Sequence, residues 1–276
     1  MKSIHVVERL LPFAWQEAVI RCWYEGNRFR TEYDKPDDPE SRDVLCVIHV
    51  TEPFAEPRIH RAFPGGLNDL EKYRDEVLDG VHDHWVDPEQ GKWQYTYHQR
   101  LFEYEVPGVG VIDQIEAVMT KLRGTGHTRR AQAVTWQAWK DVGIHDPACL
   151  QRLWFRIEQE RLNMVAHMRS NDAFKAAFMN MYAFTELQRW MADRLGVACG
   201  EYVHIADSFH IYGSYFRDFE AFLQLVTRRR KDDLCYDTAF AREFFIDGVK
   251  ELLAEADMPP HKRVLLQRRL EELGGA

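Results

Sequence analysis

The chain has 276 residues, of which 45% are hydrophobic and 13% aromatic, so it can bury a substantial core. A formal net charge of −8 argues against a general nucleic-acid-binding protein, and no apolar stretch reaches the roughly 18 residues of a membrane span. Five scattered cysteines without a C-x-x-C pair, and no hydrophobic signal segment at the start, favour reduced thiols over disulfides or a zinc site. We therefore expect a cytoplasmic protein without a metal.

The first hundred residues predict two helices separated by a strand. Residues 6–23 have the spacing of an amphipathic helix, and the β-branched run at 44–50 predicts a buried strand. Residues 68–81 predict a second helix with Asn68 as its N-cap. Residues 93–97 predict a short strand or an extended arm.

The remainder of the chain predicts a strand-rich centre followed by helices. Residues 113–123 predict an amphipathic helix, and 149–158 and 161–169 predict two antiparallel strands joined by a polar tip. Residues 173–195 are rich in Ala, Met and Phe, which predicts a long buried central helix. The other expected elements are strands at 131–136 and 203–205 and helices at 216–228, 240–256 and 261–273. This mixture predicts an α+β fold with one mixed sheet, and no linker divides the single domain 1–276.

Cys149, in the segment His145-Asp-Pro-Ala-Cys-Leu150, is the strongest candidate for a catalytic residue. A thiol becomes a good nucleophile when it loses its proton, and neighbouring guanidinium groups favour the thiolate. Arg129, Arg130 and Arg169 can supply that charge. A cytosolic cysteine on its own is more often a buried structural thiol, so the interpretation depends on the surrounding motifs.

Four segments between about residues 93 and 216 follow one another with a distinctive order and spacing. They are Ile112-Asp-Gln-Ile115 leading to Thr128-Arg-Arg130 and Ala133-Val-Thr-Trp136, then Pro147-Ala-Cys149, then Arg169-Ser-Asn-Asp172 with Asn180, and then His210-Ile-Tyr212. Together they resemble the thymidylate synthase family, which includes the pyrimidine nucleotide hydroxymethylases. The resemblance implies a mixed sheet packed by helices around a long buried central helix, with the sheet forming a homodimer interface.

The resemblance also implies a reaction: transfer of one carbon from 5,10-methylenetetrahydrofolate to C5 of a pyrimidine nucleoside monophosphate. Cys149 would attack C6 of the base, and Tyr97 would help to remove the C5 proton. Glu76 would relay protons around O4, with Glu71 as the alternative carboxylate. Asp172 would hold the pterin of the folate, although a surface or capping carboxylate is the plainer interpretation.

The same resemblance assigns the nucleotide-binding residues. Arg169 and Ser170 would bind the phosphate from one subunit, and Arg129 and Arg130 would reach it across the interface of a homodimer. His210 and Tyr212 would bind the sugar. Because the family's Gly/Thr-rich phosphate loop is not recognisable here, Arg42 is the best substitute for its arginine.

Asn180 would recognise the base, and an amide at this position favours uracil, because the cytidylate hydroxymethylases tend to carry an acidic residue there. We therefore expect conversion of dUMP to dTMP. A dCMP or CMP hydroxymethylase is the alternative, because 271–276 does not resemble the family's apolar C-terminal lid and 174–179 departs from the common pattern. A non-catalytic nucleotide-binding relative is the third possibility. His82 and His84 suggest a metal site, but no further ligands stand at a recognisable spacing.

Overall fold

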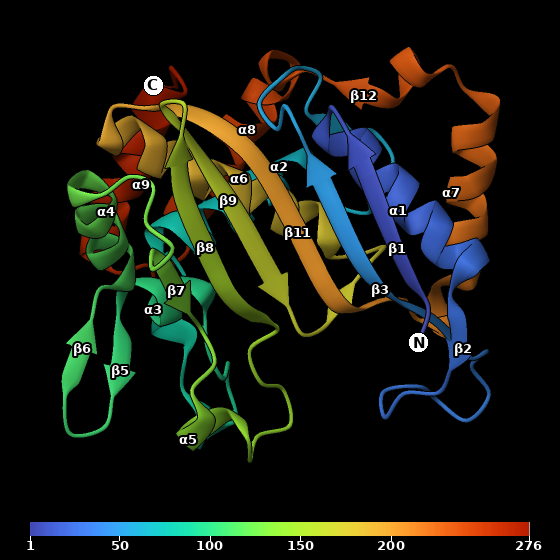
Figure 1. Cartoon of the computed structure of the whole chain (residues 1–276), viewed down its shortest axis with the longest axis horizontal. Coiled ribbons are helices and arrows are strands. Elements are labelled where there is room, and N and C mark those ends of the chain that lie inside the picture. Colours follow the sequence, from blue (N-terminus) through green and yellow to red (C-terminus); the bar gives the residue numbers. More distant parts are fainter. Residues whose placement is uncertain (276) are drawn as a thin grey trace.

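A computed structural model describes residues 1–275 and has an eight-stranded mixed sheet at its centre (Figure 1). Six strands follow the order β1-β3-β11-β9-β8-β7, while β2 pairs with β3 and β10 with β11. The strands of this sheet are β1 (Ser3–Glu8), β2 (Asn27–Phe29), β3 (Ser41–Val50), β7 (Gln132–Val134), β8 (Leu150–Glu158), β9 (Arg161–Met168), β10 (Asn171–Asp172) and β11 (Ala198–Ile211). Because β11 runs parallel to β9 and antiparallel to β3, the sheet is mixed, which confirms the predicted α+β class.

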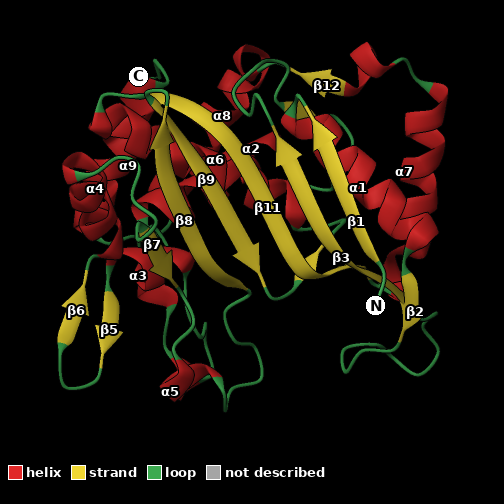
Figure 2. Cartoon of the chain, viewed as in Figure 1, coloured by secondary structure: helices red, strands yellow, loops and turns green. Residues whose placement is uncertain are grey.

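Helices cover one face of the main sheet, and the other face is open toward the viewer in Figure 2. The helices are α1 (Leu11–Glu25), α2 (Leu67–Asp79), α3 (Tyr97–Phe102), α4 (Gln114–Gly124), α5 (Ala138–Asp141), α6 (Ala177–Leu195), α7 (Phe216–Arg228), α8 (Thr238–Ala254) and α9 (Pro260–Glu272). Two smaller sheets pair β4 (Ile59–His60) with β12 (Cys235–Tyr236) and β5 (Tyr104–Val106) with β6 (Gly110–Ile112). Short 3₁₀ helices lie at Asp83–Trp85, Pro88–Gln90, Gly213–Tyr215 and Lys231–Leu234.

The two faces of the sheet differ in burial because side chains alternate along each strand. Tyr202 and Ala206 of β11 are fully buried against the helices. Val203 and Ile205 of the same strand, and Val165 of β9, are half-buried on the open face. The open face therefore carries apolar side chains that one copy of the chain does not fully cover.

α6 is the buried central helix that the sequence predicts, and thirteen of its nineteen residues are buried. Its core side includes a buried ion pair, in which the Arg58 guanidinium donates to Glu186 Oε1 at 2.5 Å and to Thr185 Oγ1 at 3.1 Å. The Arg58 and Arg189 charges hold the pKa of Glu186 at about 2 despite its burial. This ion pair connects α6 to the loop before β4 at one side of the core.

β11 contains one extra residue relative to β3. Ala206 pairs with Cys46 and Phe209 pairs with Val44, so three steps along β11 match two steps along β3. This is a β-bulge, and it shifts which residues face the core from that point onward. His210 follows it directly.

Three predictions need correction. Residues 3–8 form β1 and the helix starts at Leu11, because alternating burial, not helical spacing, places Ile4 and Val6 in the core. The strand predicted at 203–205 extends over the whole of β11. Gly66, not Asn68, is the N-cap of α2. Of the two alternatives predicted for 93–97, the structure has the extended arm, which ends where Thr96 caps α3 and makes one β-bridge, from Trp93 to Val86.

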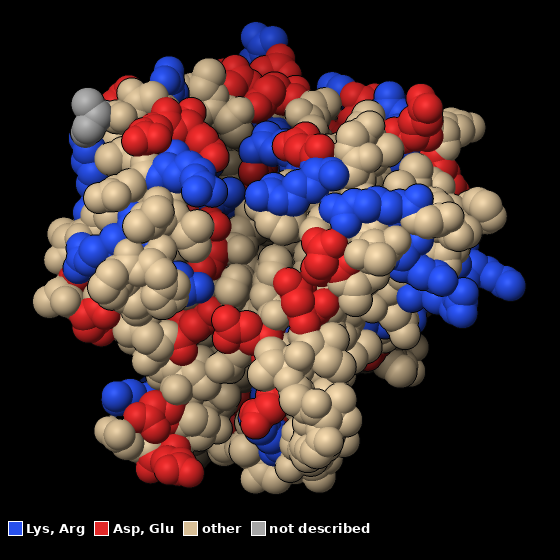
Figure 3. Space-filling view, turned by 90° about the vertical axis from the view of Figure 1, so that its left-hand side faces the viewer, with Lys and Arg blue, Asp and Glu red and all other residues tan. Residues whose placement is uncertain are grey.

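The side of the molecule that carries α4 and α9 shows Lys and Arg side chains interspersed with Asp and Glu (Figure 3). Neither sign of charge dominates that face. Within residues 1–275, no helix combines the length and the apolar character that a membrane crossing requires.

Candidate active site

Cys149 lies in the turn that leads into β8, and Arg169 follows β9 beside it. Because β8 and β9 are antiparallel, the start of one strand meets the end of the other. The Arg169 guanidinium donates to the carbonyl of Pro147 at 2.6 Å and to that of Ala148 at 3.1 Å, and lies 3.7 Å from the Cys149 sulfur. The two residues that the sequence predicts to act together are therefore in contact.

Two tyrosines hold the backbone of the same turn. The N–H of Cys149 donates to the hydroxyl of Tyr95, and the N–H of Leu150 donates to that of Tyr97, both at 3.3 Å. The two rings lie 5.6 Å apart, because Tyr95 and Tyr97 flank the Thr96 N-cap of α3. The Cys149 turn is thus held by two side chains from one short segment.

The protonation of Cys149 depends on opposing influences. Burial raises the pKa of the thiol, the Arg169 guanidinium lowers it, Asp146 raises it, and a hydrogen bond from Tyr95 lowers it. The net pKa is above the ordinary value. In this state the thiol holds its proton, and donors beside the sulfur favour its removal.

Two cavities that share His145 and Asp146 in their walls lie at the Cys149 turn, and Cys149 itself lines the smaller. The smaller has a volume of about 290 Å³, and its lining comprises Tyr33, His145, Asp146, Cys149, Arg169, Ser170 and Tyr212. The larger has a volume of about 500 Å³, and its lining comprises Tyr73, Glu76, Lys92, Trp93, Gln94, Tyr95, Thr96, Tyr97, His145 and Asp146. The smaller cavity carries the Arg169 guanidinium beside the Cys149 sulfur, whereas the wall of the larger includes four aromatic side chains, Tyr73, Trp93, Tyr95 and Tyr97.

His210 lies beside the smaller cavity through its contact with Tyr212. The two rings meet edge to face at 4.6 Å, and the Nδ1 atom of His210 lies 3.3 Å from both Ser208 Oγ and Ser208 O. Nε2 of this buried histidine has no partner among the described residues. A buried nitrogen without a partner is costly, which fits a group that binds a ligand atom.

Asn180 of α6 lies behind the larger cavity. The Tyr73 hydroxyl, which lines that cavity, donates to Asn180 Oδ1 at 2.5 Å. Burial raises the pKa of Tyr73 well above its usual range, so its hydroxyl remains a donor. The Asn180 amide therefore has its oxygen held toward Tyr73.

Of the two carboxylates that the sequence leaves open, Glu76 lines the larger cavity. Its Oε2 lies 3.0 Å from Nδ1 of His82, whose pKa is raised, because the hydrogen bond and charge of Glu76 outweigh the effect of burial. Glu71 instead forms a buried ion pair with Arg269 at 2.5 Å. The structure thus places Glu76, and not Glu71, beside the Cys149 turn.

Four other predicted residues do not line either cavity. Asp172 accepts the N–H groups of Phe174 and Lys175 at 3.0 and 2.8 Å, and so caps the turn before α6. The guanidinium of Arg42 lies over the rings of Trp23 and Phe216. Arg129 and Arg130 are exposed on the loop before β7.

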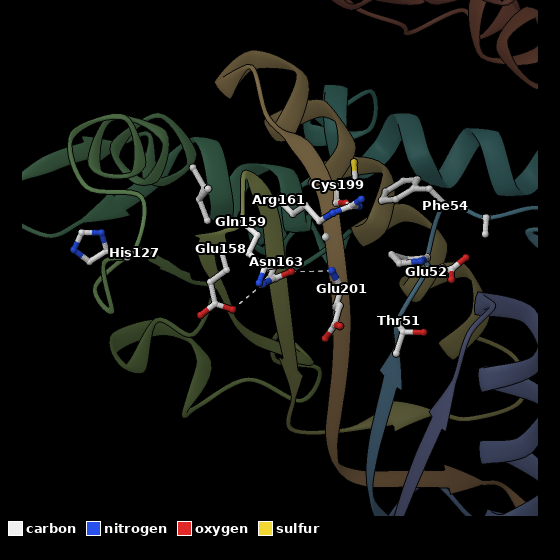
Figure 4. A pocket seen from close by; sticks show the side chains of 14 residues that line it. Thr51, Glu52, Phe54, His127, Glu158, Gln159, Arg161, Asn163, Cys199 and Glu201 are labelled. Atoms are coloured by element: carbon white, nitrogen blue, oxygen red, sulfur yellow. Dashed lines mark hydrogen bonds between the residues drawn. The ribbon is translucent and has the colours of Figure 1, made fainter.

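A cavity of about 1080 Å³, larger than either of these, lies elsewhere, at the end of the sheet that carries the tip between β8 and β9 (Figure 4). Asn163 Oδ1 accepts the N–H of Glu201 there, and its Nδ2 donates to Glu158. None of the predicted site residues lines it. Its size is therefore no indication of the reaction centre.

Sequence analysis missed several residues of the two cavities. Tyr95 lies two positions before Tyr97, and Tyr73 lies one helical turn before Glu76, so both spacings carried a usable signal. Other missed residues are Tyr33, His145 and Asp146 of the smaller cavity and Lys92, Trp93, Gln94 and Thr96 of the larger. Tyr33 had no signal, because it comes from an irregular loop far away in the sequence and reaches the site by its contact with the His145 carbonyl at 3.3 Å.

Known proteins are similar to this chain in sequence and in fold. A family model described as thymidylate synthase matches residues 67–243. A protein of Methanocaldococcus jannaschii named "Putative thymidylate synthase" is 31% identical over 75% of this chain and 89% of its own length. A Methanothermobacter thermautotrophicus protein of the same name is 30% identical over 79% and 96% of the two chains.

The fold is also that of thermostable thymidylate synthase A from Bacillus subtilis, with a TM-score of 0.61, 17% identity, and coverage of 77% of this chain and 83% of that one. The matched family region includes Cys149, Arg169, Asn180 and Tyr212. The resemblance carried by the four motifs is thereby confirmed. The chain belongs to the thymidylate synthase family, whose members are one-carbon transferases that use methylenetetrahydrofolate as co-substrate.

Proposed function

We propose that the protein converts dUMP to dTMP with 5,10-methylenetetrahydrofolate. The observation that carries this proposal is the Cys149 sulfur, held 3.7 Å from the Arg169 guanidinium beside two adjoining cavities. The smaller cavity suits a nucleoside monophosphate, with Arg169 and Ser170 toward the phosphate and Tyr212 with His210 toward the sugar.

The proposed chemistry begins with addition of the Cys149 thiolate to C6 of the base. The S–C6 bond forms as the C5–C6 double bond opens, and its electrons move to C5 and O4. C5 then bonds to the methylene carbon of the co-substrate as one of its two carbon–nitrogen bonds breaks, and C5 loses its proton. Tyr97 and Glu76 are the groups that we assign to proton movement there. The second carbon–nitrogen bond breaks as tetrahydrofolate leaves, and for methylation a hydride from tetrahydrofolate reduces the resulting exocyclic methylene and leaves dihydrofolate. Release of Cys149 from C6 completes the cycle.

The larger cavity suits the folate. Its walls include the rings of Tyr73, Trp93, Tyr95 and Tyr97, which can pack against a flat heterocycle. We therefore assign the pterin to these walls and give Asp172, which caps the turn before α6, at most a supporting part.

We further propose that the open face of the sheet forms a homodimer interface, with Arg129 and Arg130 reaching the phosphate of the partner's site. The half-buried Val165, Val203 and Ile205 on that face support this assignment, since association would remove their apolar surface from water. The exposure of both arginines leaves them free for such a role. Arg42, stacked over two aromatic rings, stays a weaker candidate for the phosphate.

A dCMP or CMP hydroxymethylase is the second candidate, and the polar part of the larger cavity favours it. Glu76, Gln94 and Asp146 line that cavity and can order water beside the transferred carbon. Water added there in place of hydride gives a hydroxymethyl group. A non-catalytic relative is the weakest reading, because Cys149 and Arg169 are both present and in contact.

Product analysis distinguishes these functions. The protein is incubated with methylenetetrahydrofolate and each of dUMP, dCMP, UMP and CMP, and the nucleotide mass is measured. A methyl group on dUMP with dihydrofolate supports the proposal, whereas a hydroxymethyl group with tetrahydrofolate identifies a hydroxymethylase. Cys149→Ser is the control, and turnover that survives this change contradicts the covalent mechanism.

A further inference from the structure

Tyr95 touches the nucleophile turn in a way that the reaction described above does not use. Its hydroxyl oxygen accepts the N–H of Cys149 at 3.3 Å, while its ring lines the larger cavity. The neighbouring Tyr97 holds the next N–H along the chain, that of Leu150. Two side chains from one short segment thus fix consecutive backbone groups at the start of β8.

A tyrosine hydroxyl carries one proton and can accept as well as donate. Since the oxygen of Tyr95 already accepts the Cys149 N–H, its own proton remains available to a nearby acceptor. Burial raises the pKa of Tyr95, so the hydroxyl keeps that proton. The hydrogen bond from Tyr95 is also one of the influences that lower the pKa of the Cys149 thiol.

The other donor beside the sulfur has competing duties. Arg169 donates to the carbonyls of Pro147 and Ala148 and lies 3.7 Å from Cys149 Sγ, a long contact for a hydrogen bond. Under the proposed function it also binds phosphate. The Tyr95 hydroxyl has two neighbours of its own: it accepts the Cys149 N–H, and a hydrogen bond with Tyr97 lowers the pKa of Tyr95. Both contacts engage its oxygen and leave its proton free.

We propose that Tyr95 is a positioning residue for the nucleophile: it orients Cys149 through the backbone N–H and donates its hydroxyl proton to the Cys149 thiolate. This inference rests on the proposed function in so far as Cys149 is the nucleophile. The step is a hydrogen bond to a sulfur that has lost its proton, so Tyr95 itself stays neutral. Phenol donation favours the thiolate before any substrate arrives.

Several titratable or charged groups face the thiol, and each can influence the pH dependence of its reactivity. They come from the Cys149 segment, the strand ends and the Tyr95 arm, and they are His145, Asp146, Arg169, Tyr33, Tyr73, Tyr95, Tyr97 and Tyr212. Of these, Tyr95 is the one whose hydroxyl meets the Cys149 backbone.

The test is alkylation of Cys149 by iodoacetamide in the full chain without substrate, from about pH 7 to about pH 11.5, followed on the Cys149 peptide by mass spectrometry. Tyr95→Phe removes only the hydroxyl. We expect it to raise the midpoint of the profile by about one pH unit, which is about tenfold slower alkylation below the midpoint. An unchanged midpoint overturns the proposal.

Tyr104→Phe is the matched control, because Tyr104 is a buried tyrosine whose hydroxyl donates to the Trp136 carbonyl at 2.8 Å. Tyr104→Phe should leave the alkylation profile unchanged. If it shifts the midpoint as much as Tyr95→Phe does, the effect of Tyr95→Phe reflects a general loss of rigidity. If Tyr95→Phe does not fold, fluorotyrosine at position 95 keeps the shape and strengthens the donor. The midpoint should then fall, and a constant midpoint again overturns the proposal. Since no substrate is present, failure of the proposed function leaves this result intact.

Discussion

The Arg169 guanidinium lies 3.7 Å from the Cys149 sulfur while it donates to the two carbonyls that precede this cysteine. One side chain therefore fixes the turn and supplies positive charge to the thiol. The planar fork of donors suits this double task, which a lysine cannot perform with a single ammonium group.

Substitution of Arg169 should separate its two contributions. Arg169→Lys keeps the charge but loses the fork, and we expect it to retain much of the thiol reactivity while kcat/KM falls by roughly a hundredfold, or about 3 kcal/mol. Arg169→Ala should lose both. The alkylation profile of Cys149 and the steady-state kinetics measure the two effects, and a wild-type profile for Arg169→Ala would count against the assigned charge effect.

The base preference should depend on Asn180 and on the Tyr73 hydroxyl that holds its oxygen at 2.5 Å. Asn180→Asp replaces an amide with a group that accepts hydrogen bonds when ionised, so it suits the amino group of cytosine better than O4 of uracil. We expect the ratio of kcat/KM for dUMP to that for dCMP to fall by roughly a hundredfold. Tyr73→Phe frees the amide and should weaken discrimination without inverting it. A ratio untouched by Asn180→Asp removes Asn180 from base recognition.

A shared site in the proposed homodimer predicts complementation between two inactive variants. Cys149→Ser is mixed with a chain that carries Arg129→Ala and Arg130→Ala, and subunits are exchanged by mild denaturation. If both arginines act across the interface, each heterodimer contains one complete site and about a quarter of wild-type activity returns. If they act within their own subunit, none returns. Ile205→Arg on the open face should block dimer formation and complementation together, as measured by sedimentation.

His60 should make the fold sensitive to acid. It is fully buried, its Nδ1 accepts the Ala62 N–H at 3.0 Å, and its Nε2 lies 2.9 Å from Gln16 Oε1, so the ring is held neutral. Burial lowers its pKa to about 4. Because the unfolded chain binds this proton near pH 6.5 and the folded chain near pH 4, the free energy of unfolding should fall by up to about 3 kcal/mol across that interval.

Urea unfolding at about pH 7 and about pH 4.5 measures this loss, and His60→Gln should reduce it. His204, whose pKa burial lowers to about 3, contributes a second loss with the same sign, so part of the dependence should remain. Equal pH dependence in the variant and the wild type would show that His60 is not responsible.

The predictability of the fold differed between neighbouring strands for physical reasons. The hairpin of β8 and β9 was evident because both strands alternate cleanly and a polar tip separates them. β1 was missed because Val6 fits the spacing of the following helix as well as a strand pattern. The length of β11 was underestimated because Gly200 and Ser208 interrupt its apolar alternation, and only pairing with two long neighbours carries the strand through them.

The site could be predicted as far as the motifs extend. Cys149, Arg169, Ser170 and Tyr212 do line one cavity, as their spacing suggested. Arg42 does not line it, because this second residue of β3 has its guanidinium over the rings of Trp23 and Phe216. Tyrosines such as Tyr33 could not be found, since their direction depends on how a loop packs and not on their immediate neighbours.

The bulge in β11 has a consequence for insertion and deletion. Removing one residue between Ala206 and Phe209 would leave two steps of β11 against two steps of β3, so Phe209 would still oppose Val44 and still face the core. Removing one residue after Phe209 has no such compensation, because the side chains that follow would then change face and Tyr212 would be displaced from the cavity that it lines. Relatives of this chain should therefore tolerate the loss of one residue at the bulge better than the loss of one residue beyond it.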